Sequence, residues 1–187
     1  WRQGRQRQGR LVTAAPPIAA GRRIASVEAT AYRIPTDASE ADGTIAWDAT
    51  TLVLAQVSAG GQTGLGYTYA HAAAAALISD PLRGCLLGAD ADDIPAAWGA
   101  MNRALRNIGR PGLGLMAIAA VDHALWDLKA RLHETSVVRL LGAARNAVPV
   151  YGSGGFTSYS TERLQEQLAG WAADGIPRVK MKVGTCP

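Results

Sequence analysis

The stretch AVPVYGSGGFTSYSTERLQEQLAGWAADGIPRVKMKVG, residues 147–184, decides how this chain folds. Its first five residues, 147–151, are apolar and predict a short strand that opens into a glycine-rich loop. A helix follows, with Ser160 or Thr161 placed to cap it and apolar residues at helical spacing. A second strand is predicted at 179–183. A strand, a helix and a strand of this length are typical of a parallel crossover connection.

The second strand carries Lys180 and Lys182 at positions i and i+2. Successive side chains of a strand point to opposite faces, so the two ammonium groups lie on one face, roughly 7 Å apart. They are two of only three lysines, against sixteen arginines. A lysine can lose its proton where an arginine cannot, and two like charges on one face lower each other's pKa. The pair therefore indicates a working base, with a solvent-facing edge strand as the alternative.

The residues ahead of this unit predict three meandering strands, at 24–34, 50–58 and 63–69. The first two are separated by a polar loop, 36–49, which carries a tryptophan, Trp47, near its end. Ala59-Gly60-Gly61-Gln62 has the composition of a hairpin turn between the second and third strands.

Helices are predicted after the meander. Asp92 or Asp93 can cap a helix that runs to about Asn107. Apolar residues recur at helical spacing over Leu113–Leu132, and a short helix over Val137–Leu141 ends at a glycine.

Composition excludes several protein classes. The chain has 187 residues, 48% of them hydrophobic, and no uninterrupted apolar run approaches the length of a membrane span. Cys85 and Cys186 lie far apart, without the spacing of a disulfide framework or a metal site. We therefore expect a soluble, cytoplasmic protein with no membrane partner.

The net charge of +4 comes from the N-terminal end. Residues 1–23 hold six arginines and no acidic residue, and without them 13 basic residues stand against 15 acidic ones. This Arg/Gln/Gly-rich stretch lacks apolar periodicity and predicts a disordered basic tail. It could contact RNA or an anionic surface, act as a transit peptide, or be translated sequence without a role. Nothing in the rest of the chain indicates a nucleic-acid partner.

Three segments together carry a resemblance. AIAAVDHALWDLKARLHETSVVRLLGA, residues 117–143, leads through VPVYGSGG, 148–155, into RVKMKVG, 178–184. With the meander ahead of it, this arrangement resembles the mandelate racemase/muconate-lactonizing branch of the enolase superfamily over roughly residues 24–187.

The resemblance implies an α+β capping domain, a three-stranded meander plus helices, followed by the start of a (β/α)₇β TIM-like barrel that is truncated after its second strand. We accordingly expect residues 1–23 to form the disordered basic tail. Residues 24–146 would be the capping domain with its connecting helices, and 147–187 the first β-α-β unit of an incomplete barrel.

It also implies a chemistry. Members of this family abstract the proton next to a substrate carboxylate, and Mg²⁺ holds the resulting enolate. Carried over, Lys182 would be the base that removes or returns the proton, and Lys180 would hold the carboxylate and lower the pKa of Lys182. Ser153, at the end of the first barrel strand, would contact substrate, or would simply be a serine in a glycine-rich turn.

Further site residues are implied in the capping domain. Trp47, in the 37–47 loop, and Tyr67 would contact substrate as parts of lids, with ordinary packing as the alternative. His71 would begin a helix near the lid, with a position facing the substrate as the alternative. The remaining histidines, with Asp122 and Asp127 on the predicted long helix, would be structural.

The Mg²⁺ ligands of the family would all lie beyond residue 187, so this chain supplies none of them. The resemblance implies a small carboxylate or acid-sugar substrate and allows a homo-oligomer. Dehydration, racemisation and cycloisomerisation are all compatible with the two lysines, so the chain would be the N-terminal portion of a lyase or isomerase, most simply an acid-sugar dehydratase or a racemase/epimerase. The alternative is a catalytically inactive remnant that serves only in binding or oligomerisation.

Overall fold

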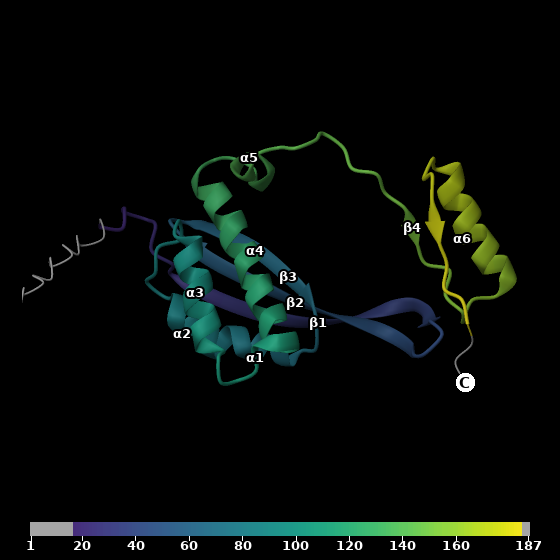
Figure 1. Cartoon of the computed structure of the whole chain (residues 1–187), viewed down its shortest axis with the longest axis horizontal. Coiled ribbons are helices and arrows are strands. Elements are labelled where there is room, and N and C mark those ends of the chain that lie inside the picture. Colours follow the sequence, from purple (N-terminus) through teal and green to yellow (C-terminus); the bar gives the residue numbers. More distant parts are fainter. Residues whose placement is uncertain (1–16, 185–187) are drawn as a thin grey trace, which may run out of the picture.

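A computed structural model describes residues 17–184 of the chain (Figure 1). Its larger part is an antiparallel sheet in the order β1 (Ser26–Ala41), β2 (Ala46–Ala59) and β3 (Gln62–Tyr69). Its smaller part is a parallel pair, β4 (Gly152–Ser153) and β5 (Val179–Lys180), beside helix α6 (Thr161–Ala173). Residues 1–16 of the predicted basic tail and residues 185–187 lie outside the described residues.

The predicted meander is confirmed, but its first two strands are longer than predicted. The polar loop predicted at 36–49 is wrong: β1 and β2 continue through it as a hairpin with a register shift between Pro35 and Glu40. The turn is closed by the Asp42 carboxylate, which accepts from the backbone N–H of Thr44 at 2.7 Å and of Ile45 at 3.0 Å. In this hairpin the two strands pair with each other and cover no hydrophobic core. Their residues therefore do not alternate between apolar and polar, which is the pattern that would have predicted a strand.

The connection from β3 into the long helix is built from a bent helix and a straight one. The bent helix comprises α1 (Ala73–Leu77), a wider turn η1 (Ile78–Leu82) and α2 (Arg83–Leu86). The wide turn contains Pro81, which has no N–H to donate within a regular helix. The straight helix is α3 (Ile94–Ala104). Of the two predicted cap residues, Asp92 and Asp93, it is Asp93 that caps the helix, because its carboxylate accepts from the Ala96 N–H at 3.1 Å.

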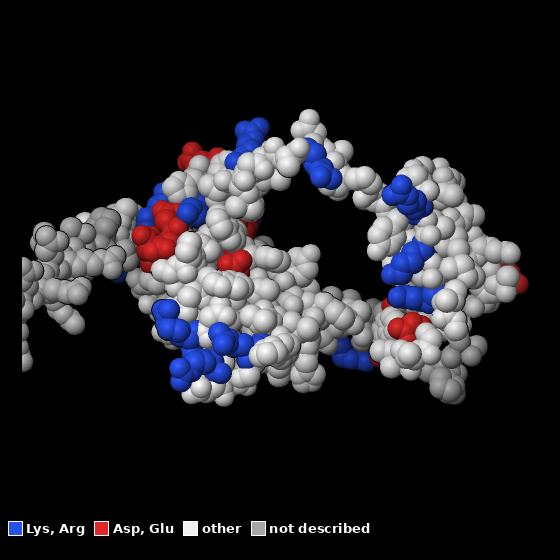
Figure 2. Space-filling view, in the orientation of Figure 1, with Lys and Arg blue, Asp and Glu red and all other residues white. Residues whose placement is uncertain are grey.

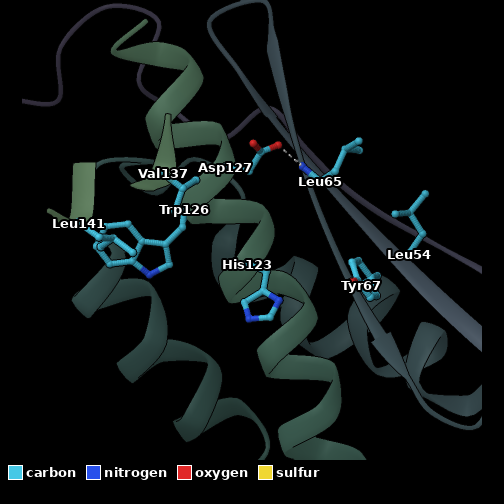
Figure 3. Close-up of a pocket in the computed structure, with 8 residues that line it drawn as sticks. All are labelled: Leu54, Leu65, Tyr67, His123, Trp126, Asp127, Val137 and Leu141. Atoms are coloured by element: carbon cyan, nitrogen blue, oxygen red, sulfur yellow. Dashed lines mark hydrogen bonds between the residues drawn. The ribbon is translucent and has the colours of Figure 1, made fainter. Parts of the chain in front are cut away.

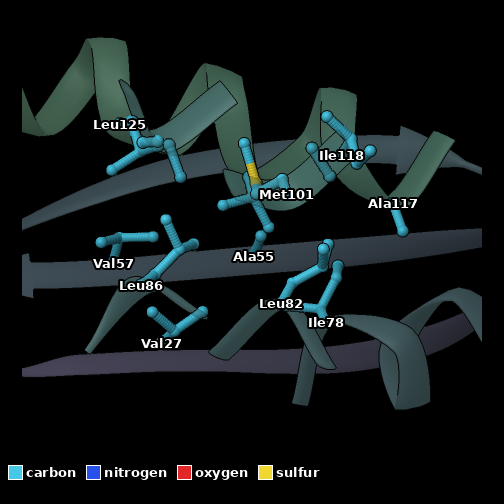
Figure 4. Close-up of a cluster of buried hydrophobic side chains, with 14 of the residues drawn as sticks. Val27, Ala55, Val57, Ile78, Leu82, Leu86, Met101, Ala117, Ile118 and Leu125 are labelled. Atoms are coloured by element: carbon cyan, nitrogen blue, oxygen red, sulfur yellow. The ribbon is translucent and has the colours of Figure 1, made fainter. Parts of the chain in front are cut away.

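The long helix packs its apolar side on the sheet. After an irregular turn, η2 (Arg110–Gly114), α4 (Leu115–Leu132) crosses β2 and β3, and α5 (Val137–Leu141) follows at its end. Both helices confirm the sequence prediction. The core between helices and sheet is shown in Figure 4 and includes Val27, Val53, Val57, Met101, Ile118 and Leu125, each no more than 1% exposed.

Two glycines set the close approach of α4 to β3. A Cβ on Gly64 would overlap the Ala124 carbonyl and the Leu128 amide, and one on Gly66 would overlap the Ala120 carbonyl. The strand therefore lies directly against the helix backbone, where no side chain fits. On the opposite face of the sheet, Tyr32, Ile34, Leu65, Tyr67 and Tyr69 are exposed.

The end of the predicted basic tail contacts the folded part. We expected the tail to run to Arg23, yet the Arg22 guanidinium donates to the Leu132 carbonyl at 3.3 Å and lies 3.6 Å from the Asp92 carboxylate. Arg23 donates to the Gly88 carbonyl at 3.0 Å. Arg22 therefore joins the last turn of α4 to the loop before α3, and Arg23 contacts that same loop.

The smaller part differs from the prediction in where its first strand lies. The strand predicted at 147–151 is wrong, because within the described residues no other strand pairs with that segment. Pairing begins instead at Gly152, whose N–H donates to the Arg178 carbonyl at 2.9 Å. Helix α6 confirms the prediction, with Ser160 accepting from the Arg163 N–H at its start.

The two parts enclose an opening. The linker from α5 to β4 joins them on one side and the β1–β2 hairpin on the other, and the space-filling view shows a hole between them (Figure 2). Within residues 17–184, no helix combines the length and the apolar character that crossing a bilayer requires.

Candidate active site

The parallel ladder places Ser153 beside Lys180. The two residues are register partners across β4 and β5. The ladder continues beyond the two-residue strands, because the Gly154 N–H donates to the Lys180 carbonyl at 3.2 Å and the Lys182 N–H donates to the Gly155 carbonyl at 2.8 Å. Three of the predicted site residues, Ser153, Lys180 and Lys182, therefore share one short stretch of sheet at the carboxyl end of its strands.

The two lysines lie on the face of this sheet that points away from α6. A Cβ built on Gly155 would lie 2.7 Å from the Met181 Cβ and 3.0 Å from the Leu164 Cδ1, so Met181 is directed toward the helix. Alternation along the strand then puts Lys180 and Lys182 on the other face. Lys180 is exposed and Lys182 is half-buried.

Positive charge gathers on this side. Three cationic side chains, Arg178, Lys180 and Lys182, stand at alternate positions of the same strand segment and so share this face. Figure 2 shows Lys and Arg side chains along the side of the smaller part that faces the opening. A face with several cations and open access favours an anionic ligand such as a carboxylate.

The tip of the β1–β2 hairpin, residues 37–47, reaches this unit from the larger part. Trp47 lies edge-to-face on Phe156, with ring centroids 5.5 Å apart, and its indole N–H donates to the Glu40 carboxylate at 2.7 Å. The Thr157 N–H donates to the Ala41 carbonyl at 3.0 Å. Trp47 is therefore held against the loop that follows β4, on the same side of the molecule as Ser153.

Asp42 brings a negative charge to the same region. Hydrogen bonds from the backbone N–H groups of Ile45 and Thr44 and from the Thr44 hydroxyl lower the pKa of its carboxyl, and the positive charge of Lys182 acts in the same direction. The carboxylate is thus ionised at neutral pH. Next to it, a Cβ on Gly43 would lie 3.2 Å from the Val183 carbonyl oxygen, so the turn lies directly on the end of β5.

Tyr67 lies apart from these residues. It is 63% exposed and, with His123 and Trp126, lines a pocket of about 650 Å³ bounded by β2, β3, α4 and α5 (Figure 3). The lining is mostly apolar and includes none of Trp47, Ser153 and the two strand lysines. The structure therefore brings together Ser153, Lys180 and Lys182, places Trp47 against Phe156 in the loop that follows β4, and places Tyr67 at another surface.

The acids and histidines expected to be structural have structural contacts. The Asp127 carboxylate accepts from the Leu65 N–H at the edge of β3, at 2.9 Å, and from Arg131 at 2.8 Å. Burial raises the pKa of Asp122, opposed in part by the charge of His123.

Two of the three histidines have identified partners. His71 accepts from the N–H of Ala73, the first residue of α1, at 3.1 Å. His133 lies 2.8 Å from the Asp92 carboxylate, beside the arginine contacts that join the start of α3 to the end of α4.

The residues present do not fit a magnesium site. Within residues 17–184, no group of three or more His, Cys, Asp or Glu side chains is close enough to hold a metal ion. Near the lysine pair the hairpin offers Asp42, whose carboxylate already accepts three hydrogen bonds that close its own turn. A metal that stabilises an enolate would therefore need ligands other than these residues.

Sequence reasoning missed the residues that join the two parts, above all Phe156, Thr157 and Arg163. The sequence holds two signals for them. Phe156 is the only phenylalanine of the chain, and Arg163 follows Tyr159 at a spacing of four residues. Neither signal names the partner, because those partners lie on the hairpin, more than a hundred positions earlier in the chain.

Comparison with known proteins defines the family. The N-terminal domain model of the mandelate racemase / muconate lactonizing enzyme family matches residues 25–142. The chain is 39% identical over 167 residues to a 3,6-anhydro-alpha-L-galactonate cycloisomerase of Streptomyces coelicolor, covering 86% of this chain and 46% of the relative. The chain thus spans about half the length of the curated relative it matches.

Solved structures show the same fold. A mandelate racemase/muconate lactonizing enzyme-like protein from Rubrobacter xylanophilus is 54% identical, with a TM-score of 0.84 over 87% of this chain and 45% of that chain. The L-talarate/galactarate dehydratase from Salmonella typhimurium, liganded with Mg and L-lyxarohydroxamate, is 28% identical, with a TM-score of 0.79 over 93% of this chain and 48% of that chain. The sheet and helices of residues 25–142 are therefore the N-terminal capping domain of this fold. The chain belongs to the mandelate racemase / muconate lactonizing enzyme family.

Proposed function

We propose that this chain is the N-terminal portion of an enzyme that removes the proton next to the carboxylate of an acid sugar, as a dehydratase, cycloisomerase or racemase/epimerase. The observation that carries the proposal is the face of β5, where Lys180 and half-buried Lys182 lie beside Ser153 at the carboxyl end of a parallel pair. The named relatives, a cycloisomerase and a dehydratase of acid sugars, support the same class of substrate.

The roles follow from position and charge. Lys180 is exposed and lies beside Ser153, so its ammonium group and the serine hydroxyl are placed to bind a substrate carboxylate. Lys182 lies two residues further along the same face, and in its neutral form it accepts the α-proton, leaving the negative charge on the substrate as an enolate. Delivery of a proton to the opposite face of the enolate, by a second acid, completes a racemisation, and loss of a β-hydroxyl that takes up a proton from a general acid and leaves as water completes a dehydration.

The chemistry also needs an electrophile for the enolate, which the residues described here do not supply. The dehydratase structure from Salmonella typhimurium carries Mg, and we propose that in this protein a magnesium site would be contributed by barrel strands other than β4 and β5. The parallel pair β4 and β5, open at both edges, is the start of that barrel in this proposal. The capping domain and the first β-α-β unit would then supply the base, the carboxylate contact and the hairpin lid.

Titration with galactarate tests the binding half of the proposal on the 187-residue chain itself. Amide resonances of Ser153, Lys180 and Lys182 are expected to shift and saturate as galactarate is added, and Lys180→Ala should abolish the saturation. Lys129→Ala is the matched control, because Lys129 is the third lysine and donates to the Asp92 carbonyl on the far side of the capping domain. Shifts that are unchanged by Lys180→Ala, or lost equally with Lys129→Ala, would contradict the proposal.

A second candidate function, a non-catalytic binding or oligomerisation module, is favoured by the uncovered face of the larger sheet. Tyr32 and Tyr69 on its outer strands are 47% and 68% exposed. Aromatic residues clustered on an open face are typical of interaction surfaces. Sedimentation velocity distinguishes the two functions: self-association that survives Lys182→Ala but is lost with Tyr69→Ser supports the module.

A further inference from the structure

Two segments that are distant in the sequence are joined by a set of hydrogen bonds at the hairpin tip. The Thr157 N–H donates to the Ala41 carbonyl at 3.0 Å, and the Thr157 hydroxyl donates to the Asp42 carbonyl at 3.1 Å. The Ser158 hydroxyl donates to the Ser39 carbonyl at 2.6 Å. These three hydrogen bonds connect the loop after β4 to the end of β1 and the turn that follows it.

Arg163 completes this set from the first turn of α6. Its guanidinium donates to the Asp37 carboxylate at 2.7 Å and lies 4.2 Å from the ring centroid of Tyr159. Tyr159 in turn packs edge-to-face on Phe156, with centroids 5.4 Å apart. The arginine is therefore oriented by its own helix and loop and reaches across to the hairpin, which a flexible lysine would do less well.

We infer that residues 156–163 form a clip that holds the hairpin tip, residues 37–47, over the end of β4 and β5, and that Arg163 is its positioning residue. That the covered strand ends hold the site lysines rests on the proposed function. The clip itself is defined by its contacts alone. Its consequence is that the Asp42 turn stays next to Lys182 and Val183 only while the clip is closed.

The clip is built to open. The side chains of its ion pair are 38% exposed at Arg163 and 77% exposed at Asp37, so solvent and salt screen the attraction. The hydrogen bonds are made to backbone carbonyls of the hairpin, and none of the residues of the clip or the hairpin tip belongs to the hydrophobic core of the larger part. Segments held by a few exposed contacts open locally, without unfolding of the domain.

The Thr157 amide reports on the clip directly, because the carbonyl that accepts its hydrogen bond lies across the junction, on Ala41. Hydrogen exchange of this amide, measured by NMR on the 187-residue chain, is the test. Replacing Arg163 by alanine is expected to raise its exchange rate about two- to five-fold, the effect of losing one exposed ion pair. The amide of Leu125, in the middle of α4 and fully buried, should exchange at the unchanged rate.

Two further variants make the test specific. Arg33→Ala removes an ion pair of the same hairpin, 2.8 Å from Asp48, which does not cross to the other part, and should leave Thr157 exchange unchanged. Asp37→Arg and Arg163→Asp should each speed exchange of the Thr157 amide when made alone. The double variant, which restores an ion pair with its charges reversed, should bring the exchange rate back down.

The inference is overturned if Thr157 exchange is unaffected by Arg163→Ala, or if it rises in parallel with Leu125 exchange, which would mean a global loss of stability. An effect of Arg33→Ala equal to that of Arg163→Ala would also overturn it. No substrate enters the experiment, so a failure of galactarate binding and a failure of the clip are separate results.

Discussion

Trp47 and Phe156 meet edge-to-face, with ring centroids 5.5 Å apart and ring planes at 90°, although one lies on the hairpin of the capping domain and the other follows β4. This contact joins the two described parts of the molecule, on the same hairpin whose Asp42 turn lies next to Lys182. Replacing either side chain is therefore expected to change how the two parts are held together.

The first prediction concerns this aromatic contact. A double-mutant cycle of Trp47→Leu and Phe156→Leu is expected to give a coupling energy of about 0.5–1.5 kcal/mol, the range for aromatic pairs. The free energy of local opening, measured from Thr157 amide exchange, is the quantity to compare. Additive effects of the two changes would show that the rings do not stabilise the junction.

The second prediction concerns the approach of α4 to β3. Gly66→Ala is expected to lower the free energy of unfolding by about 3 kcal/mol, because the new methyl group meets the backbone of α4, which cannot move without displacing the whole helix. Urea denaturation measures it. Gly84→Ala is the control, since nothing lies within 4 Å of that position in α2, and it should stabilise by about 0.5–1 kcal/mol. Equal effects of the two changes would contradict the packing described here.

The third prediction uses the pKa of Asp122. Burial raises this pKa in the folded state, so the folded protein holds the proton more tightly than the unfolded chain does. Stability contributed by the group is present at low pH and lost as the pH rises through the raised pKa. Asp122→Asn should therefore raise the melting temperature at pH 7, by an amount that shrinks as the pH approaches 4. A lower melting temperature for the variant at pH 7 would contradict this account.

The fourth prediction concerns Asp127, one helical turn and a residue further along α4. Its carboxylate accepts from the Leu65 N–H and from Arg131, so Asp127→Ala leaves an edge-strand donor without its protein partner. We expect a loss of about 1 kcal/mol in the free energy of unfolding, since the Leu65 backbone can turn to water. Arg131→Ala removes the second contact alone and should cost less. Replacing Asp122 is thus expected to stabilise the protein and replacing Asp127 to destabilise it. The difference arises because the Asp122 charge is partly buried, whereas the Asp127 charge is hydrogen-bonded.

The parts of the fold that the sequence predicted are those with a strong periodic signal or a clear cap. The apolar spacing over Leu113–Leu132 predicts α4 because the helix packs one side on the sheet, and Asp93 and Ser160 predict the starts of α3 and α6 because their side chains satisfy N–H groups at those helix ends. The hairpin over 36–49 was not predicted, since it covers no core and leaves no alternation. The strand expected at 147–151 was misplaced because apolar residues there have no neighbouring strand within the described residues.

The candidate site follows the same division. Alternation along the strand was enough to predict that Lys180 and Lys182 share one face, whereas Ser153 was placed beside them only by the family resemblance. Tyr67 could not be separated from them in the sequence, because its distance from the lysines depends on how the capping sheet is oriented. The clip through Arg163 was beyond prediction for the same reason: it consists of pairs between segments whose approach is set by the fold as a whole.

The central claim, that Lys182 is the base, is tested most directly by α-proton exchange in D₂O. Residues 17–184 would replace the matching part of the Streptomyces coelicolor cycloisomerase, and the rest of the chimera would come from that relative, of which this chain covers 46%. With 3,6-anhydro-alpha-L-galactonate and Mg²⁺, the chimera is expected to exchange the proton, Lys182→Ala to slow exchange by about 10²–10⁴-fold, and Lys129→Ala to leave it unchanged. Exchange that survives Lys182→Ala at the full rate would contradict the account, and so would a folded, magnesium-bound chimera that exchanges no proton.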